Sequence, residues 1–104
     1  MVRGEVWLAA LDRTVGSEFQ TRPCLIVSPA EMHDYLRTVT VAPLTTGNRP
    51  APYRIPVEFQ GKNGLILVDQ IRTLDKQRLV RLLGAVPRRT LGLTLAALRE
   101  AFEE

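Results

Sequence analysis

At 104 residues the chain has room for one domain, which we expect to cover residues 1–104; its 45% hydrophobic and 24% charged residues are ordinary for a globular protein. Cys24 is the only cysteine, which excludes an internal disulfide, and no apolar run approaches the roughly 20 residues that span a bilayer, so we expect a cytoplasmic protein. The net charge of +3 comes mainly from arginine, because Lys62 and Lys76 are the only lysines, and this weakly favours a nucleic-acid partner.

The first half of the chain predicts three strands. In chain order the expected elements are a strand over 6–11, a polar loop over 12–21, a strand over 24–27, a short helical turn over 31–36 and a strand over 38–42. Apolar residues alternate or run together in the strands, and β-branched residues mark the third. A ten-residue loop is uncommon in so small a domain unless it acts as a lid or a binding loop. His33, in the helical turn, is expected to be a surface histidine without a chemical role.

The second half predicts a hairpin and a C-terminal helix. Its expected elements are an edge strand over 53–59, a turn over 61–64, a buried strand over 65–68, a mixed segment of turn and strand over 75–84, and a helix over 90–102. Leucines recur at helical spacing on one face of the last segment, and Thr90 is a suitable N-cap. The predicted fold is therefore mainly β, a small antiparallel β-barrel with short helices that include a C-terminal one.

The common catalytic motifs are missing from the sequence. One cysteine and one histidine provide neither a convincing Cys–His nucleophile pair nor a zinc ligand set. No glycine-rich phosphate loop of the Walker or Rossmann type is present. We therefore expect no metal and no cofactor.

Four short segments, in order, carry a resemblance to a known family. They are RGEVW at 3–7, GSEFQTRPCLIVSP at 16–29, VAPLTT at 41–46 and VDQIRTLDKQRL at 68–79. Together they resemble the MazF/PemK family of toxins from type II toxin–antitoxin systems, over essentially the whole chain. The chain departs from the family pattern before Arg22, where Gln20 runs straight into Thr21 although relatives usually carry one more residue between them.

The resemblance implies a barrel of the SH3-like or CcdB-like kind that works as a homodimer. It also implies an endoribonuclease, or mRNA interferase, that cuts single-stranded RNA at a short sequence without a metal ion. Attack by the RNA's own 2′-hydroxyl would leave a 2′,3′-cyclic phosphate and a 5′-hydroxyl. The implied protein partner is a cognate antitoxin whose acidic, disordered tail suits a basic toxin.

The resemblance places the catalytic residues at Arg22 and Thr45. An arginine beside a hydroxyl donor can stabilise the charge that builds on the phosphate oxygens. Candidate RNA-binding residues are Ser17, Glu18, Thr46, Arg54, Gln70 and Arg72. Glu18 is also a candidate proton acceptor, and Asp69 with Gln70 could equally be a structural hydrogen-bonding pair.

Two other functions are compatible with the same fold. One is a toxin without nuclease activity that binds a protein target such as gyrase, as CcdB-like proteins do, through the surface near its C-terminal helix. The other is a degenerate family member that only binds RNA or antitoxin.

Overall fold

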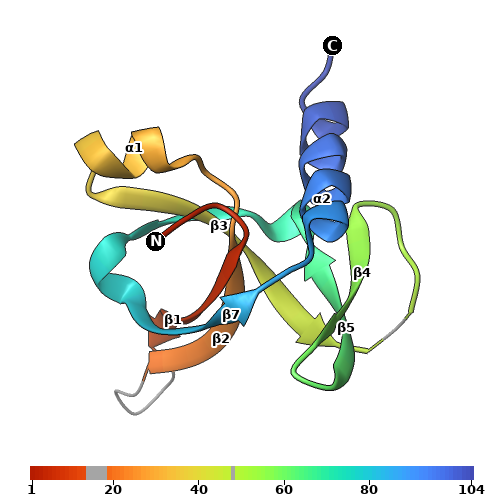
Figure 1. Ribbon diagram of the computed structural model, residues 1–104, viewed down its shortest axis with the longest axis horizontal. Coiled ribbons are helices and arrows are strands. Elements are labelled where there is room, and N and C mark those ends of the chain that lie inside the picture. Colours follow the sequence, from red (N-terminus) through yellow and green to blue (C-terminus); the bar gives the residue numbers. More distant parts are fainter. Residues whose placement is uncertain (14–18, 48) are drawn as a thin grey trace.

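The computed structural model describes residues 1–13, 19–47 and 49–104 of the chain (Figure 1). The strands are β1 (Glu5–Arg13), β2 (Phe19–Ile26), β3 (Thr38–Thr46), β4 (Arg54–Phe59), β5 (Lys62–Leu67), β6 (Arg72–Asp75) and β7 (Leu79–Ala85). The α-helices are α1 (Ala30–Tyr35) and α2 (Arg88–Ala101), and two short 3-10 helices are η1 (Val68–Gln70) and η2 (Lys76–Arg78). No helix within the described ranges is long and apolar enough to cross a membrane.

One strongly bent antiparallel sheet forms the framework, with strand order β4-β5-β3-β2-β1-β7 and β6 added beside β3. Strand β3 is central because it changes partners along its length. Its first part pairs with β6 on one edge, its middle pairs with β2 on the other, and its last three residues pair with β5. This confirms the mainly-β prediction with a C-terminal helix, although no pairing among the described residues closes the sheet into a complete barrel.

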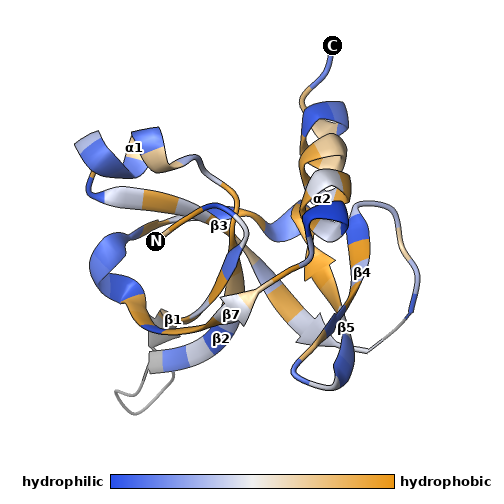
Figure 2. Cartoon of the chain, viewed as in Figure 1, coloured by the Kyte–Doolittle hydropathy of each residue, from blue (hydrophilic) through white to orange (hydrophobic). Residues whose placement is uncertain are grey.

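Two hydrophobic clusters lie on opposite faces of the central strands. In β2, Leu25 belongs to the cluster shared with the β4–β5 hairpin and α2, whereas Cys24 and Ile26 belong to the cluster shared with β6. Figure 2 shows hydrophobic residues concentrated along β5, while α1 is largely hydrophilic. Since both faces of β2 are buried at its C-terminal end, residues 24–26 form a continuous apolar run rather than an alternating one, whereas the first half of β3 alternates threonine and valine.

Several predicted boundaries differ from the structure. Strand β1 extends to Arg13 and strand β2 begins at Phe19. The two strands are longer than predicted because they pair with each other well into the segment expected to be a loop. Helix α2 begins at Arg88 after Pro87, two residues before the predicted Thr90, and no side chain caps it. The predicted hairpin is confirmed, but its turn is Gln60–Gly61, where φ values of 52° and 76° match the two-residue turns typical of tight hairpins.

The prediction of a surface histidine is wrong. His33 is only 5% exposed, and its Nε2 lies 2.6 Å from the hydroxyl of Ser28. That hydroxyl also accepts a hydrogen bond of 3.0 Å from the backbone N–H of Thr40. The ammonium group of Lys76 donates a hydrogen bond to the backbone carbonyl of His33. His33 therefore anchors α1 to β3, which is a structural role.

Gly64 allows the close approach of β5 to the end of β3. A Cβ at position 64 would collide with the backbone carbonyl oxygen of Thr45, whereas a Cβ at Gly92 of α2 would meet nothing within 4 Å. Gly64→Ala should therefore lower the free energy of unfolding by about 1–3 kcal/mol, as overpacking does. Gly92→Ala should raise it by up to about 1 kcal/mol because alanine favours helix. Urea denaturation of both variants tests this, and equal stability of the two would contradict it.

Candidate functional site

The structure brings Arg22 and Thr45 together at the point where β2 and β3 separate. The last recorded pair between these strands is Cys24 with Pro43, and the same register continued two residues further places Arg22 opposite Thr45. The Nη2 atom of Arg22 donates a hydrogen bond of 3.3 Å to the backbone carbonyl of Leu44. The guanidinium group therefore lies against the peptide that precedes Thr45.

The change of partner along β3 explains this arrangement. Beyond Pro43, β3 pairs with β5, where Thr45 lies opposite Leu65 and Thr46 opposite Gly64. Proline has no N–H to donate, so it is a natural place for a ladder to break. The Arg22 side chain then reaches a backbone carbonyl of β3 that lies beyond the last recorded β2–β3 pair.

A second arginine adds positive charge near Arg22. Arg72 on β6 lies opposite Val41 in the β3 register. Burial raises the pKa of the Cys24 thiol to about 11, and the positive charges of Arg22 and Arg72 both oppose that shift. Both guanidinium groups are therefore close enough to act on one buried thiol, which stays neutral and is a poor nucleophile.

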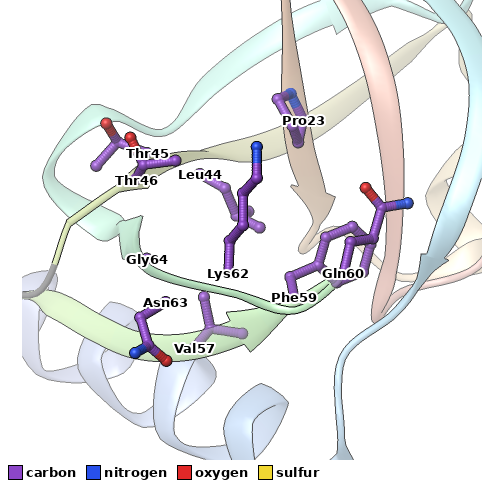
Figure 3. A pocket seen from close by; sticks show the side chains of 10 residues that line it. All are labelled: Pro23, Leu44, Thr45, Thr46, Val57, Phe59, Gln60, Lys62, Asn63 and Gly64. Atoms are coloured by element: carbon purple, nitrogen blue, oxygen red, sulfur yellow. The ribbon is translucent and has the colours of Figure 1, made fainter.

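Two hollows meet at the end of β3, and both are lined by Thr45 and Thr46. The first, which we call the Phe59 cleft, has a volume of about 220 Å³ and is lined by Pro23, Leu44, Thr45, Thr46, Val57, Phe59, Gln60, Lys62, Asn63 and Gly64 (Figure 3). The second, which we call the Arg49 hollow, is lined by Thr45, Thr46, Gly47, Arg49, Pro50, Ala51, Arg54 and Leu65. An extended chain could therefore cross Thr45 from one hollow to the other.

Arg54 at the border of the Arg49 hollow is held by an acidic partner. Its Nε and Nη2 atoms donate hydrogen bonds of 3.2 and 3.1 Å to the two carboxylate oxygens of Asp69. The Arg54 hydrogen bond lowers the pKa of the Asp69 carboxyl, and the same contact raises the pKa of Arg54. The recorded side-chain partner of Asp69 is therefore Arg54, a pairing that the sequence did not predict.

The predicted RNA-binding residues do not all gather at this site. Thr46 and Arg54 line the hollows, whereas Gln70 and Arg72 line neither of them. Ser17 and Glu18 lie outside the described residues. The sequence interpretation missed the cleft residues on the β4–β5 hairpin, because a turn segment containing Lys62 and Asn63 carries no motif. Among the described residues, no three His, Cys, Asp or Glu side chains gather as a metal site would require.

The match to a family model decides the classification of the chain. Residues 2–102 match the model described as PemK-like, MazF-like toxin of type II toxin-antitoxin system. The chain belongs to this toxin family. This confirms the resemblance inferred from the four sequence segments.

Individual relatives of the PemK/MazF family agree with this assignment. The chain is 39% identical to the endoribonuclease PemK of Escherichia coli, over 94% of the chain and 79% of that protein. It is 40% identical to the endoribonuclease MazF of Staphylococcus epidermidis, over 74% of the chain and 70% of that protein.

Solved structures show the same PemK/MazF fold. The Mycobacterium tuberculosis toxin MazF-mt6 superposes with a TM-score of 0.78 at 26% identity, covering 94% of this chain and 95% of that one. An endoribonuclease from a mycobacterial species, solved in complex with its cognate antitoxin, superposes with a TM-score of 0.80 at 28% identity. That match covers 97% of this chain and 93% of the other.

The Arg54–Asp69 contact makes a prediction for acid titration. The carboxyl of Asp69 should titrate below its ordinary pKa in the native chain, and Arg54→Gln should raise its pKa. Because the folded-state pKa is lowered, the pair stabilises the fold at neutral pH and loses this contribution as pH falls through that pKa. The effect on stability should be small, since both side chains are partly exposed.

Carbon-13 NMR of the side-chain carboxyl during acid titration measures this shift. Arg99→Gln removes an exposed arginine from α2 and should leave the titration of Asp69 as it is in the native chain. If both variants titrate like the native chain, the contact does not exist in solution.

Proposed function

We propose that this toxin is a sequence-selective endoribonuclease that cleaves single-stranded RNA, mRNA in the cell, with Arg22 and Thr45 acting on the scissile phosphate. The observation that supports this most directly is the hydrogen bond from Arg22 to the Leu44 carbonyl, which holds the guanidinium beside Thr45. The PemK and MazF relatives that the chain matches at 39% and 40% identity are named endoribonucleases.

The chemistry requires charge stabilisation that these two residues can supply. As the 2′-oxygen forms a bond to phosphorus, negative charge builds on the non-bridging oxygens. Arg22 would exchange the Leu44 carbonyl for one of these oxygens, and the hydroxyl of Thr45 would donate to the phosphate. The bond from phosphorus to the 5′-oxygen then breaks, one proton leaves the 2′-hydroxyl and another reaches the 5′-oxygen. The products are a 2′,3′-cyclic phosphate and a 5′-hydroxyl, and no step requires a metal ion.

The position of Arg22 suits this role in two ways. Pro23 restricts the backbone of Arg22 to extended conformations, so the side chain leaves the strand in a fixed direction. Arg72 adds a second positive charge nearby, as the opposing effects of both arginines on the Cys24 pKa indicate. Positive charge at this end of the sheet would attract the RNA backbone.

The partners follow from the same proposal. A chain with a net charge of +3 suits an antitoxin whose acidic, disordered tail covers the RNA site, and one similar endoribonuclease was solved with its cognate antitoxin. We expect the toxin to work as a homodimer in the cytoplasm. The alternatives, a gyrase-binding toxin and a degenerate binding protein, have no specific support in this site. Growth arrest with intact cellular RNA would favour the first of them, and RNA binding without cleavage the second.

Substitution of either proposed catalytic residue should abolish most of the cleavage. Removing one preorganised donor to a developing oxyanion costs roughly 10²–10³-fold in rate, so Arg22→Ala and Thr45→Val should each lose about that much. Thr45→Ser keeps the hydroxyl and should retain most of the activity. The assay is cleavage of a mixed-sequence RNA in EDTA, with the rates taken from single-turnover time courses.

A matched control separates catalysis from loss of charge. Arg89→Gln removes an exposed cation at the start of α2, far along the chain from the site, and should cleave like the native protein. Unchanged cleavage by both Arg22→Ala and Thr45→Val would show that the site lies elsewhere.

A further inference from the structure

The Phe59 cleft is an apolar cavity beside the proposed phosphate site. In antiparallel pairs, residues directly opposite each other point to the same face. Phe59 lies opposite Lys62 and Val57 opposite Gly64, while Gly64 lies opposite Thr46 of β3. Five of the lining residues therefore share one face of the β3–β5–β4 sheet: Thr46, Val57, Phe59, Lys62 and Gly64. Gly64, which has no side chain, lies on β5, between β3 and β4.

The aromatic wall of this cleft is held rigidly from behind. The Phe59 ring packs over Gly84 of β7, where an added Cβ would come to 3.3 Å of two ring atoms. The ring also packs against the hydrophobic cluster that includes Val57 and Leu44. Figure 3 shows Phe59 at one end of the cavity and Thr45 and Thr46 at the other, with the Lys62 side chain between them.

The rim of the cleft carries groups that suit a nucleotide. Lys62 provides a positive charge, and the side chain of Gln60 provides an amide donor and acceptor. Asn63 lies opposite Glu58, so its side chain points to the other face of the sheet. No acidic residue is among those that line the cavity. The backbone carbonyl of Asn63 accepts a hydrogen bond of 3.1 Å from the N–H of Gly47, which fixes this corner against the end of β3.

The size of the cavity also limits its occupant. Its volume of about 220 Å³ is below the range of about 300–1,000 Å³ that is typical for drug-sized ligands. It therefore suits one planar ring system rather than a folded peptide segment. Sequence-specific RNA recognition commonly uses such sites, in which an unstacked base lies on an aromatic ring and its edge bonds to amide groups.

We propose that the Phe59 cleft binds the base of one nucleotide next to the cleaved bond and sets the base preference at that position. Phe59 stacks on the base, the amide of Gln60 bonds to its edge, and Lys62 contacts an adjacent phosphate. This inference rests on the proposed ribonuclease function, because the RNA that crosses Thr45 delivers the base into the cleft.

Sequencing of the cleavage products tests the inference. A random-sequence RNA pool is cut in EDTA by the native chain and by Gln60→Gly, Phe59→Leu, Lys62→Gln and Arg89→Gln, and the 5′-hydroxyl ends are sequenced. Glycine is chosen at position 60 because the φ of Gln60 is 52°. Gln60→Gly and Phe59→Leu should reduce the preference at one flanking position about tenfold and leave the other positions unchanged. Lys62→Gln should raise KM for all sequences alike, and Arg89→Gln should match the native profile.

Two outcomes would overturn the inference. One is an unchanged base preference at every position in both Gln60→Gly and Phe59→Leu, with urea denaturation showing that they remain folded. The other is a loss of preference at all positions equally, which would indicate a general structural effect.

A second measurement separates failure of this inference from failure of the proposed function. If the native chain cuts no RNA, the nuclease proposal fails, and a 2′-O-methyl RNA oligonucleotide pool is titrated into nitrogen-15-labelled protein. Backbone amide shifts at residues 59–64 would support base binding in the cleft. Shifts at these residues with a glutamate-rich peptide but none with the RNA would assign the cleft to an acidic peptide and overturn the inference.

Discussion

The site depends on one constraint, the change of pairing partner along β3 at Pro43. Up to that residue β3 is held between β2 and β6, and beyond it β3 follows β5. Arg22 lies just beyond the last recorded β2–β3 pair, and its guanidinium reaches the Leu44 carbonyl next to Thr45. Gly64 makes the new pairing with β5 close enough, because any side chain there would strike the Thr45 carbonyl. Pairing geometry rather than a dedicated loop thus brings these two residues together.

The arginines around this junction differ in the charge of their hydrogen-bond partners. Arg54 is neutralised by its two hydrogen bonds to Asp69, whereas Arg22 bonds only to an uncharged carbonyl among its described contacts. The buried thiol of Cys24 stays protonated despite the two arginines near it, so it does not cancel their charge. Arg22 itself lines neither hollow, but it adjoins Pro23 of the Phe59 cleft, so a phosphate that approaches this junction meets the positive charge of Arg22.

The sequence predicted the fold class and most strands because alternation and β-branched runs reflect burial directly. The predicted ends of some elements are wrong. The ends of β1 and β2 depend on their pairing with each other, and the hairpin turn depends on a positive φ at Gln60 that its residue type does not suggest. His33 was misjudged because its burial depends on Ser28 and Thr40, which follow no local pattern. The pairing of Arg22 with Thr45 came only from the family resemblance. The Phe59 cleft could not be predicted, since its walls come from β2, β3 and the β4–β5 hairpin, which are brought together only by the fold.

The most direct test of this account is a double-mutant cycle on the cleavage rate, with Arg22→Ala, Thr45→Val and the double variant assayed under single-turnover conditions in EDTA. If both residues act on one phosphate, their effects are coupled, and the double variant should lose much less activity than the product of the two single losses. Losses that multiply fully would mean that Arg22 and Thr45 act independently, and that the junction at Pro43 does not build a single site.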